Sequence, residues 1–149
     1  MKTRTMLSIA TVVTTLGLAA AVGIYLNAQG TSQLQANFTN ATVAEVRDAQ
    51  GAVVLRGDFV RNDEDDDDIE RKAVLKAAGP DTDATGDAEV EFPKTAVVVQ
   101  EVEFSVKNLT PGATYAFVID GKTVTTARTD KDGSANVDLD VKMPAGGVQ

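Results

Sequence analysis

The stretch EVEFSVKNLTPGATYAFVIDGKTVTTARTDKDGSANVDLDVK (Glu101–Lys142) decides the fold class, because apolar and polar residues alternate along most of it. In its first seven residues, Val102, Phe104 and Val106 alternate with charged or polar side chains. A period of two is typical of a β-strand that has one dry face and one wet face. We therefore predict a meander of short strands in this stretch.

Turn residues separate the strands that we expect here. Asn108–Gly112 (NLTPG) interrupts the alternation, and Asp120-Gly121 can supply the two positive-φ positions of a tight hairpin. The strand before this hairpin has Ala113, Tyr115, Phe117 and Ile119 on one face, and the return strand is predicted over Lys122–Arg128. After a second turn at Thr129–Gly133, strict alternation resumes and predicts a last strand over Ala135–Met143.

The preceding part of the chain gives further strands. Thr42–Arg47 is predicted as a strand, and Ala52–Arg61 as one long strand whose Gly57 indicates a bulge or a close backbone approach. Ile69–Ala78 alternates as a returning strand, although its Ala, Leu, Lys and Arg residues leave a helix open as the alternative. Asp87–Phe92 and the run that ends at Lys107 bring the total to eight strands.

Eight short antiparallel strands need a partner for each apolar face, so we predict an all-β fold. A β-sandwich with Greek-key or meander connections is favoured over a closed barrel, because the dry faces are rich in Ala and Val. The whole is expected to follow an N-terminal signal or anchor helix. The resulting division is a signal peptide or membrane anchor over 1–28, a linker over 29–41, the sandwich over 42–143 and a tail over 144–149.

The N-terminal segment has the pattern of an export signal. Lys2 and Arg4 precede an uncharged apolar run, Met6–Leu26, which is also long enough to remain as a membrane anchor. A lipid anchor is excluded because the chain has no cysteine. With either outcome, we expect the folded part to lie outside the cytoplasm, secreted, periplasmic or on the cell surface.

The charge of the chain limits its partners. Its 149 residues include 14 Lys or Arg and 22 Asp or Glu, which gives a net charge of −8. Removal of residues 1–28 would take away Lys2 and Arg4 and change the net charge to −10. A surface of this kind repels nucleic acid and anionic lipid, so we expect neither as a partner, and membrane contact only through an uncleaved N-terminal segment.

The residue inventory argues against an enzyme. Histidine and cysteine are both absent, which excludes triad, zinc–histidine and thiol chemistry. A glycosidase would need two carboxyl groups at a fixed separation, one of them desolvated, whereas the acidic residues fall on wet faces or in loops. Tryptophan, the usual platform for sugars, is also absent. We predict no catalytic site and no certain cofactor.

Two acidic clusters are candidates for binding calcium, which prefers six to eight oxygen ligands. The first cluster is in the run Asn62–Asp68 (NDEDDDD), which is also typical of a solvated loop tip. The second cluster is Asp81–Asp87 (DTDATGD), which has the spacing of the start of an EF-hand loop; an ordinary loop is the alternative. Phe92 stands where the EF-hand pattern has its bidentate Glu. The candidate ligands are Asp63, Asp65, Asp67, Asp81, Asp83, Thr85 and Asp87.

Two segments, KAVLKAAGPDTDATGDAEVEF (Lys72–Phe92) and VEFSVKNLTPGATYAFVIDG (Val102–Gly121), resemble chordin-type (CHRD-like) domains of secreted bacterial proteins. In this chain, as in those domains, a "GxAxVxF"-like strand is followed by a "VxxLTPG"-like corner. The resemblance covers about Arg71 to Leu139 and implies a Greek-key sandwich without known enzymatic activity. The family's usual histidines are replaced by Phe117-Val118-Ile119, so no histidine-dependent role is carried over.

The function expected from the sequence is that of a non-enzymatic, exported structural or interaction module with an extracellular or surface partner. One alternative is a calcium-binding module that uses the acidic loops. Another is a fibre subunit in which an exposed strand edge or the arm Gln29–Ala41 pairs with a neighbouring copy.

Overall fold

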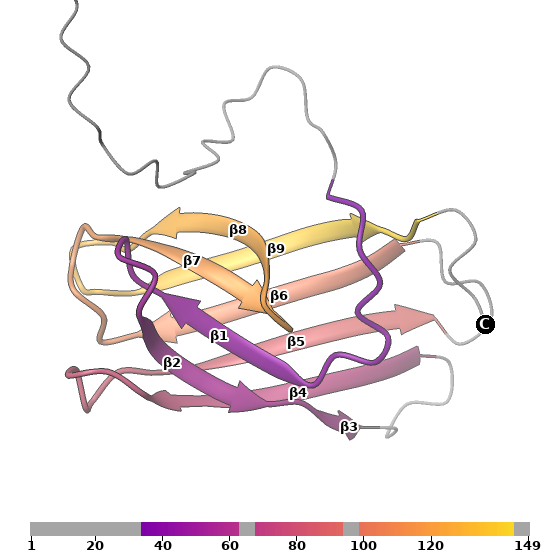
Figure 1. Ribbon diagram of the computed structural model, residues 1–149, viewed down its shortest axis with the longest axis horizontal. Coiled ribbons are helices and arrows are strands. Elements are labelled where there is room, and N and C mark those ends of the chain that lie inside the picture. Colours follow the sequence, from indigo (N-terminus) through magenta and orange to yellow (C-terminus); the bar gives the residue numbers. More distant parts are fainter. Residues whose placement is uncertain (1–33, 63–67, 94–98, 145–149) are drawn as a thin grey trace, which may run out of the picture.

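Alternating residues form strands throughout the described part of the protein. The computed structural model describes residues 34–62, 68–93 and 99–144, and these contain nine strands and no helix (Figure 1). The strands are β1 (Val43–Arg47), β2 (Val53–Asp58), β3 (Val60–Asn62), β4 (Asp68–Ala77), β5 (Thr85–Pro93), β6 (Val99–Lys107), β7 (Thr114–Ile119), β8 (Lys122–Arg128) and β9 (Ala135–Lys142). The all-β prediction is confirmed.

All neighbouring strands are antiparallel and belong to one sheet. Its order is β8-β7-β1-β2-β4-β5-β6-β9, with β3 added beside β4. In Figure 1 the sheet folds over, so that β8, β7, β1 and β2 lie in front of β9, β6, β5 and β4. The two outer strands, β8 and β9, come close to one another, so the sheet is nearly closed into a barrel. Two separate sheets, as in the expected sandwich, are not confirmed.

The predicted meander over Glu101–Lys142 is wrong in two of its three connections, because β6 does not pair with β7 and β8 does not pair with β9. The strand β6 pairs with β5 and β9, whereas β7 pairs with β1 and β8. The turn after β6, with positive φ at Asn108 and Gly112, therefore carries the chain to the other layer. Alternation fixes which side chains face the core but not which strand lies next to which, and this is why the pairing escaped prediction. The hairpin at Asp120-Gly121 is confirmed, with φ of 47° and 78°.

The core lies between the two layers. The rings of Phe104 on β6 and Phe117 on β7 meet edge to face, with their centroids 5.2 Å apart. Val102 and Val106 are also fully buried, which confirms the dry face assigned to this strand. The core also contains Leu55 from β2, which is fully buried.

The single strand predicted over Ala52–Arg61 is divided into β2 and β3. At Gly57, an added Cβ would lie 2.4 Å from the carbonyl oxygen of Val74, so the close backbone approach is confirmed. Just beyond it, the Phe59 N–H turns to the carbonyl of Thr42, 2.9 Å away, and the pairing with β4 resumes in β3. Ile69–Ala78 is a strand and not the alternative helix.

Residues 34–41, which we call the arm, do not behave as the linker that we predicted over 29–41. Ala36, Phe38 and Ala41 are buried in the core. The amide of Gln100, itself fully buried, accepts a hydrogen bond from Phe38 N–H (2.7 Å) and donates one to the Ala36 carbonyl (2.8 Å). The arm is therefore part of the folded domain, which begins at or before Leu34 and not at Thr42.

The predicted signal or anchor helix over 1–28 lies outside the described residues, as do 29–33 and all but the first residue of the predicted tail. Within the part of the chain that the structure describes, no helix is present that could cross a membrane.

Candidate functional site

The predicted calcium loop Asp81–Asp87 is divided between a turn and a strand. Asp81 and Asp83 lie in the turn between β4 and β5, where their backbone carbonyls accept hydrogen bonds from Ala84 N–H (3.2 Å) and from the Asn108 side chain (3.0 Å). Thr85 and Asp87 belong to β5 and pair with its neighbours. These four residues are not among the groups of three close acidic side chains that the described residues form.

The other predicted loop ligands, Asp63, Asp65 and Asp67, lie outside the described residues. The acidic side chains that the structure does bring together come instead from the wet faces of four strands.

Strand register aligns these side chains in two rows across β4, β5, β6 and β9. Directly paired residues point to the same side of a sheet, so each row lies on the outer face. The first row is Glu70, Glu91, Glu101 and Asp140. The second row is Lys72, Glu89, Glu103 and Asp138. We call the seven carboxylates of these rows the acidic face.

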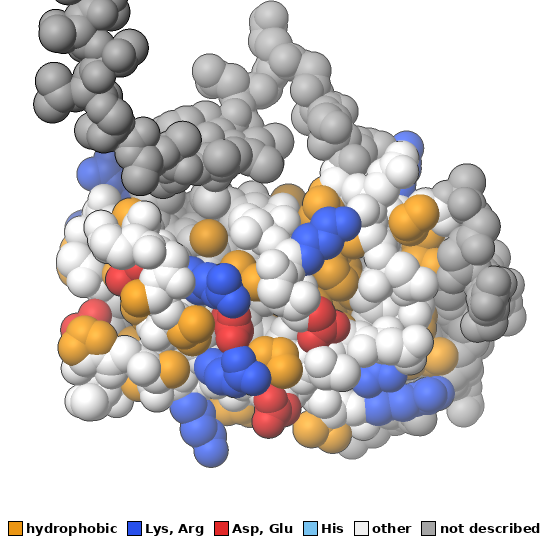
Figure 2. All heavy atoms as spheres, in the orientation of Figure 1, with side chains coloured by type: hydrophobic (Ala, Val, Ile, Leu, Met, Phe, Trp, Pro, Cys, Tyr) orange, Lys and Arg blue, Asp and Glu red, His pale blue; other side chains and the backbone are white. Residues whose placement is uncertain are grey.

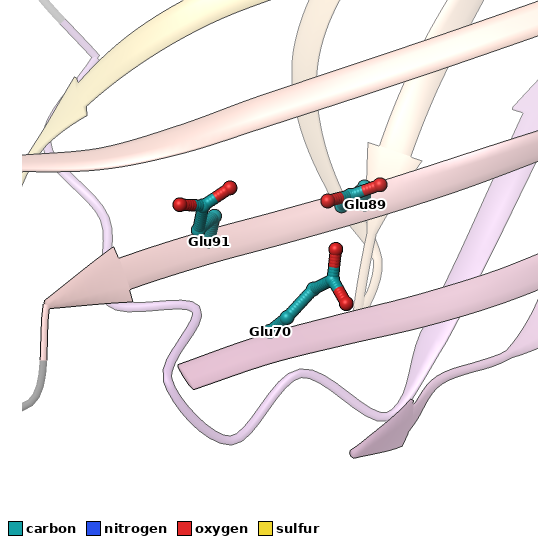
Figure 3. A group of neighbouring side chains, drawn as sticks. All are labelled: Glu70, Glu89 and Glu91. Carbon is teal, nitrogen blue, oxygen red and sulfur yellow. The ribbon is translucent and has the colours of Figure 1, made fainter. Parts of the chain in front are cut away.

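Two groups of carboxylates are especially close. Each of these groups has oxygens within 4.8 Å of one another. Glu70, Glu89 and Glu91 form the first group and are half-buried; Figure 3 shows Glu70 reaching from β4 toward Glu89 on β5, with Glu91 farther along the same strand. The second group consists of Glu101, Glu103 and Asp138, which are exposed. Like charges directly opposite one another destabilise a sheet, so this arrangement costs folding free energy.

Part of that cost is relieved by a shared proton between Glu70 and Glu89. Burial, followed by the hydrogen bond and the charge of Glu70, raises the pKa of Glu89 to about 7. The hydrogen bond from Glu89, together with Lys72 and Asn62, lowers the pKa of Glu70 to about 2. Lys72 Nζ lies 2.6 Å from Glu70 Oε1 and 3.7 Å from Glu89 Oε2, and Asn62 donates to Glu70 Oε2 at 2.7 Å.

A pair of carboxyl groups with separated pKa values is what an acid–base mechanism needs. Here, however, Glu70 and Glu89 hydrogen-bond to each other, and Lys72 bridges them. A glycosidase pair has to leave room for the scissile bond between its two carboxyl groups. The geometry therefore suits a charge cluster better than it suits catalysis.

In the second group of carboxylates, the neighbouring negative charges also shift a pKa. Desolvation, with the charges of Asp138, Glu103 and Asp140, raises the pKa of Glu101. Beside it, a hollow of about 270 Å³ is lined by side chains that include Glu89, Glu103 and Asp138. The hollow lies along the second row, where Glu89, Glu103 and Asp138 present carboxylates from three strands to a molecule that enters it.

The opposite outer face is electrostatically balanced. On β1 and β2, the buried Glu45 forms ion pairs with Arg47 and Arg56. Figure 2 shows this side of the molecule, with basic and acidic side chains interspersed. Its own hollow, of about 340 Å³, is lined by those three residues and Asp120 among others. Because the charges there already neutralise one another, this face is the weaker candidate for binding a charged partner.

Sequence reasoning placed the residues of the acidic face on wet faces but did not see that they gather. The available signal is the recurrence of acidic residues at alternate positions in three strands: AEVEF in β5, QEVEF in β6 and VDLD in β9. What local sequence lacks is the neighbour relation of β5, β6 and β9, and this alone turns three half-acidic strands into one acidic surface.

Comparison with models of protein families, with characterised proteins and with solved structures finds no match to this chain.

Proposed function

We propose that the protein is a non-enzymatic interaction module that acts outside the cytoplasm and binds a cationic partner on its acidic face. The observation that carries the proposal is the pair of cross-strand rows, which align seven carboxylates with a single lysine, Lys72, at the β4 end of the second row. A concentrated field of one sign attracts partners of the opposite sign and accelerates their encounter. The cost of placing like charges opposite one another is then offset when the partner arrives.

The cellular setting of the proposal comes from the sequence. The charged start and the apolar run before residue 28 support export, and the acidic composition disfavours nucleic acid and anionic lipid as partners. The sandwich class and the resemblance to chordin-type domains stay hypotheses, which agree with an exported module but add no residue to its site.

Binding of a lysine-rich peptide of about ten residues tests the proposal by titration calorimetry. The test variant combines Glu101→Gln, Glu103→Gln and Asp138→Asn. Each lost charge pair is worth about 0.5 kcal/mol at an exposed site, so the dissociation constant should rise about tenfold.

A matched control removes three charges away from the two rows: Asp58→Asn, Asp81→Asn and Asp132→Asn. It should change the dissociation constant by less than about threefold, because distant exposed charges are screened. Equal weakening by the two triple variants would mean that the peptide senses only net charge, and the proposal would fail.

Calcium binding is the second candidate, favoured by the two groups of three carboxylates whose oxygens lie within 4.8 Å of one another. Thermal unfolding in millimolar calcium and then in chelator tests it. Calcium at about 100 times its dissociation constant would stabilise the fold by about 2.7 kcal/mol. If the shift disappears with Glu101→Gln and Glu103→Gln, the acidic face binds the ion; if it disappears with Asp81→Asn and Asp83→Asn, the loop does. An unchanged melting temperature would contradict both.

A further inference from the structure

The arm, residues 34–41, is held mainly through its backbone. Besides the two hydrogen bonds with Gln100, the Gln35 carbonyl accepts one from Lys122 Nζ (2.8 Å), and the Thr39 carbonyl accepts one from Arg71 Nε (2.6 Å). The Ala36 N–H donates to the carbonyl of Lys142 at 3.1 Å. These contacts come from β4, β6, β8 and β9, and we call the surface that these strands present to the arm the groove.

The groove has polar and apolar parts that the arm satisfies. Gln100 is fully buried, and both polar ends of its amide are used by the arm. Without the arm, the buried amide of Gln100 would lose both of these hydrogen-bond partners, at a large cost in free energy. Phe38, which is 3% exposed, and Ala36 fill the apolar part of the same groove. An empty groove would therefore be a poorly stable state.

Thr42, which joins the arm to β1, is exposed. The arm ends in a turn closed by Ala41 N–H and the Phe38 carbonyl (2.9 Å). Directly after it, the carboxylate of Asp120 accepts hydrogen bonds from Thr42 N–H (3.1 Å) and Val43 N–H (2.9 Å) at the surface. Rotation of the backbone at Thr42 would thus let the arm leave the groove while β1 stays in the sheet.

We propose that the groove also binds the arm of a second copy, so that copies associate by arm exchange. The occupant is set by fit, because residues 34–41 of any copy carry the same backbone and the same Phe38 that fill the groove in one chain. Exchange of an identical segment creates every native contact again and needs no new interface. The arm carries no charged residue, so its entry into a second copy adds no charge to an acidic body.

Mass action sets the conditions for exchange. A segment joined by a short flexible tether competes at an effective concentration of the order of millimolar. Exchange should therefore be populated when the chains refold at about 1 mM, or when copies are crowded together on a surface. At low concentration each groove takes its own arm.

Cysteine pairing detects the exchange directly, because the natural chain has no cysteine. Gln35 and Lys142 are bridge partners at exposed positions. Full-length Gln35→Cys and full-length Lys142→Cys, carrying different tags, are mixed, refolded together at about 1 mM and oxidised gently. Only an exchanged arm brings the two thiols together, so we expect a disulfide-linked heterodimer on a non-reducing gel.

Two controls make the result decisive. Lys131→Cys mixed with Lys142→Cys measures random collision, since Lys131 is on an exposed loop, and the 35–142 pair should exceed it about tenfold. The double variant Gln35→Cys/Lys142→Cys should form an intrachain disulfide in dilute solution, which verifies the position of the arm. Heterodimer no more abundant than in the collision control, or a double variant that does not close, would overturn the proposal.

Discussion

Replacement of Gln100 by leucine should destabilise the fold strongly, although leucine is apolar and of similar size. The substitution leaves the Phe38 N–H and the Ala36 carbonyl without the partners they have at 2.7 and 2.8 Å. Both residues are at least 96% buried, so water cannot replace the lost hydrogen bonds.

The magnitude follows from these two groups. Each buried and unsatisfied group costs about 1–3 kcal/mol, whereas the added apolar surface of leucine returns about 1–2 kcal/mol. At the middle of these ranges, the two groups cost about 4 kcal/mol and the expected net loss is about 2–3 kcal/mol, a large share of the stability of a domain of this size.

Urea denaturation followed by circular dichroism measures the loss. With a slope of about 1–3 kcal/mol per molar urea, the midpoint should fall by about 1–2 M. Gln50→Leu, at an exposed turn, is the matched control and should stay within about 0.5 kcal/mol of the natural protein. If Gln100→Leu were as stable as that control, the arm would not depend on the buried amide and the account of the groove would be refuted.

Two further substitutions test the strand contacts and the carboxyl pair. Gly57→Ala places a Cβ 2.4 Å from the Val74 carbonyl oxygen and should cost about 1–3 kcal/mol in urea denaturation, whereas Gly79→Ala, whose nearest neighbour is 3.4 Å away, should cost clearly less; equal losses would contradict the close approach. Because the pKa of Glu89 is raised from 4.5 to about 7, the folded state binds its proton more tightly, and stability from this group should fall as pH rises from 4.5 through 7. Glu89→Gln, which keeps a donor for Glu70, should remove that part of the decline and gain about 1–2 kcal/mol at pH 8; an unchanged slope of stability against pH would contradict the shared proton.

Strands and turns were predictable because their signals are local. The alternation in β6 and β9, and the Asp120-Gly121 turn, report directly on backbone geometry and on the face that is buried. The neighbours of β6 were not predictable in this way, because any strand with a dry face can satisfy the same alternation. Pairing depends on how the whole sheet folds over. This is why the predicted meander was wrong and why the acidic face was not predicted.

The arm was missed for a different reason. Its Gln, Asn and Thr residues match the composition of a linker, and composition cannot reveal that Phe38 is buried. One signal was present in the sequence: Gln100 has the parity of Val102 and Phe104 and therefore falls on the dry face. A polar side chain at such a position needs a hydrogen-bonding partner, and the backbone of the arm supplies it.

Mapping of backbone amide shifts by NMR during titration with the lysine-rich peptide tests the central claim most directly. We expect the shifts to concentrate on β4, β5, β6 and β9, with the largest changes around Glu101, Glu103 and Asp138, and to diminish as salt screens the attraction. Shifts spread evenly over all acidic surfaces, or centred on the paired charges of β1 and β2, would contradict the assignment of the binding surface to the acidic face.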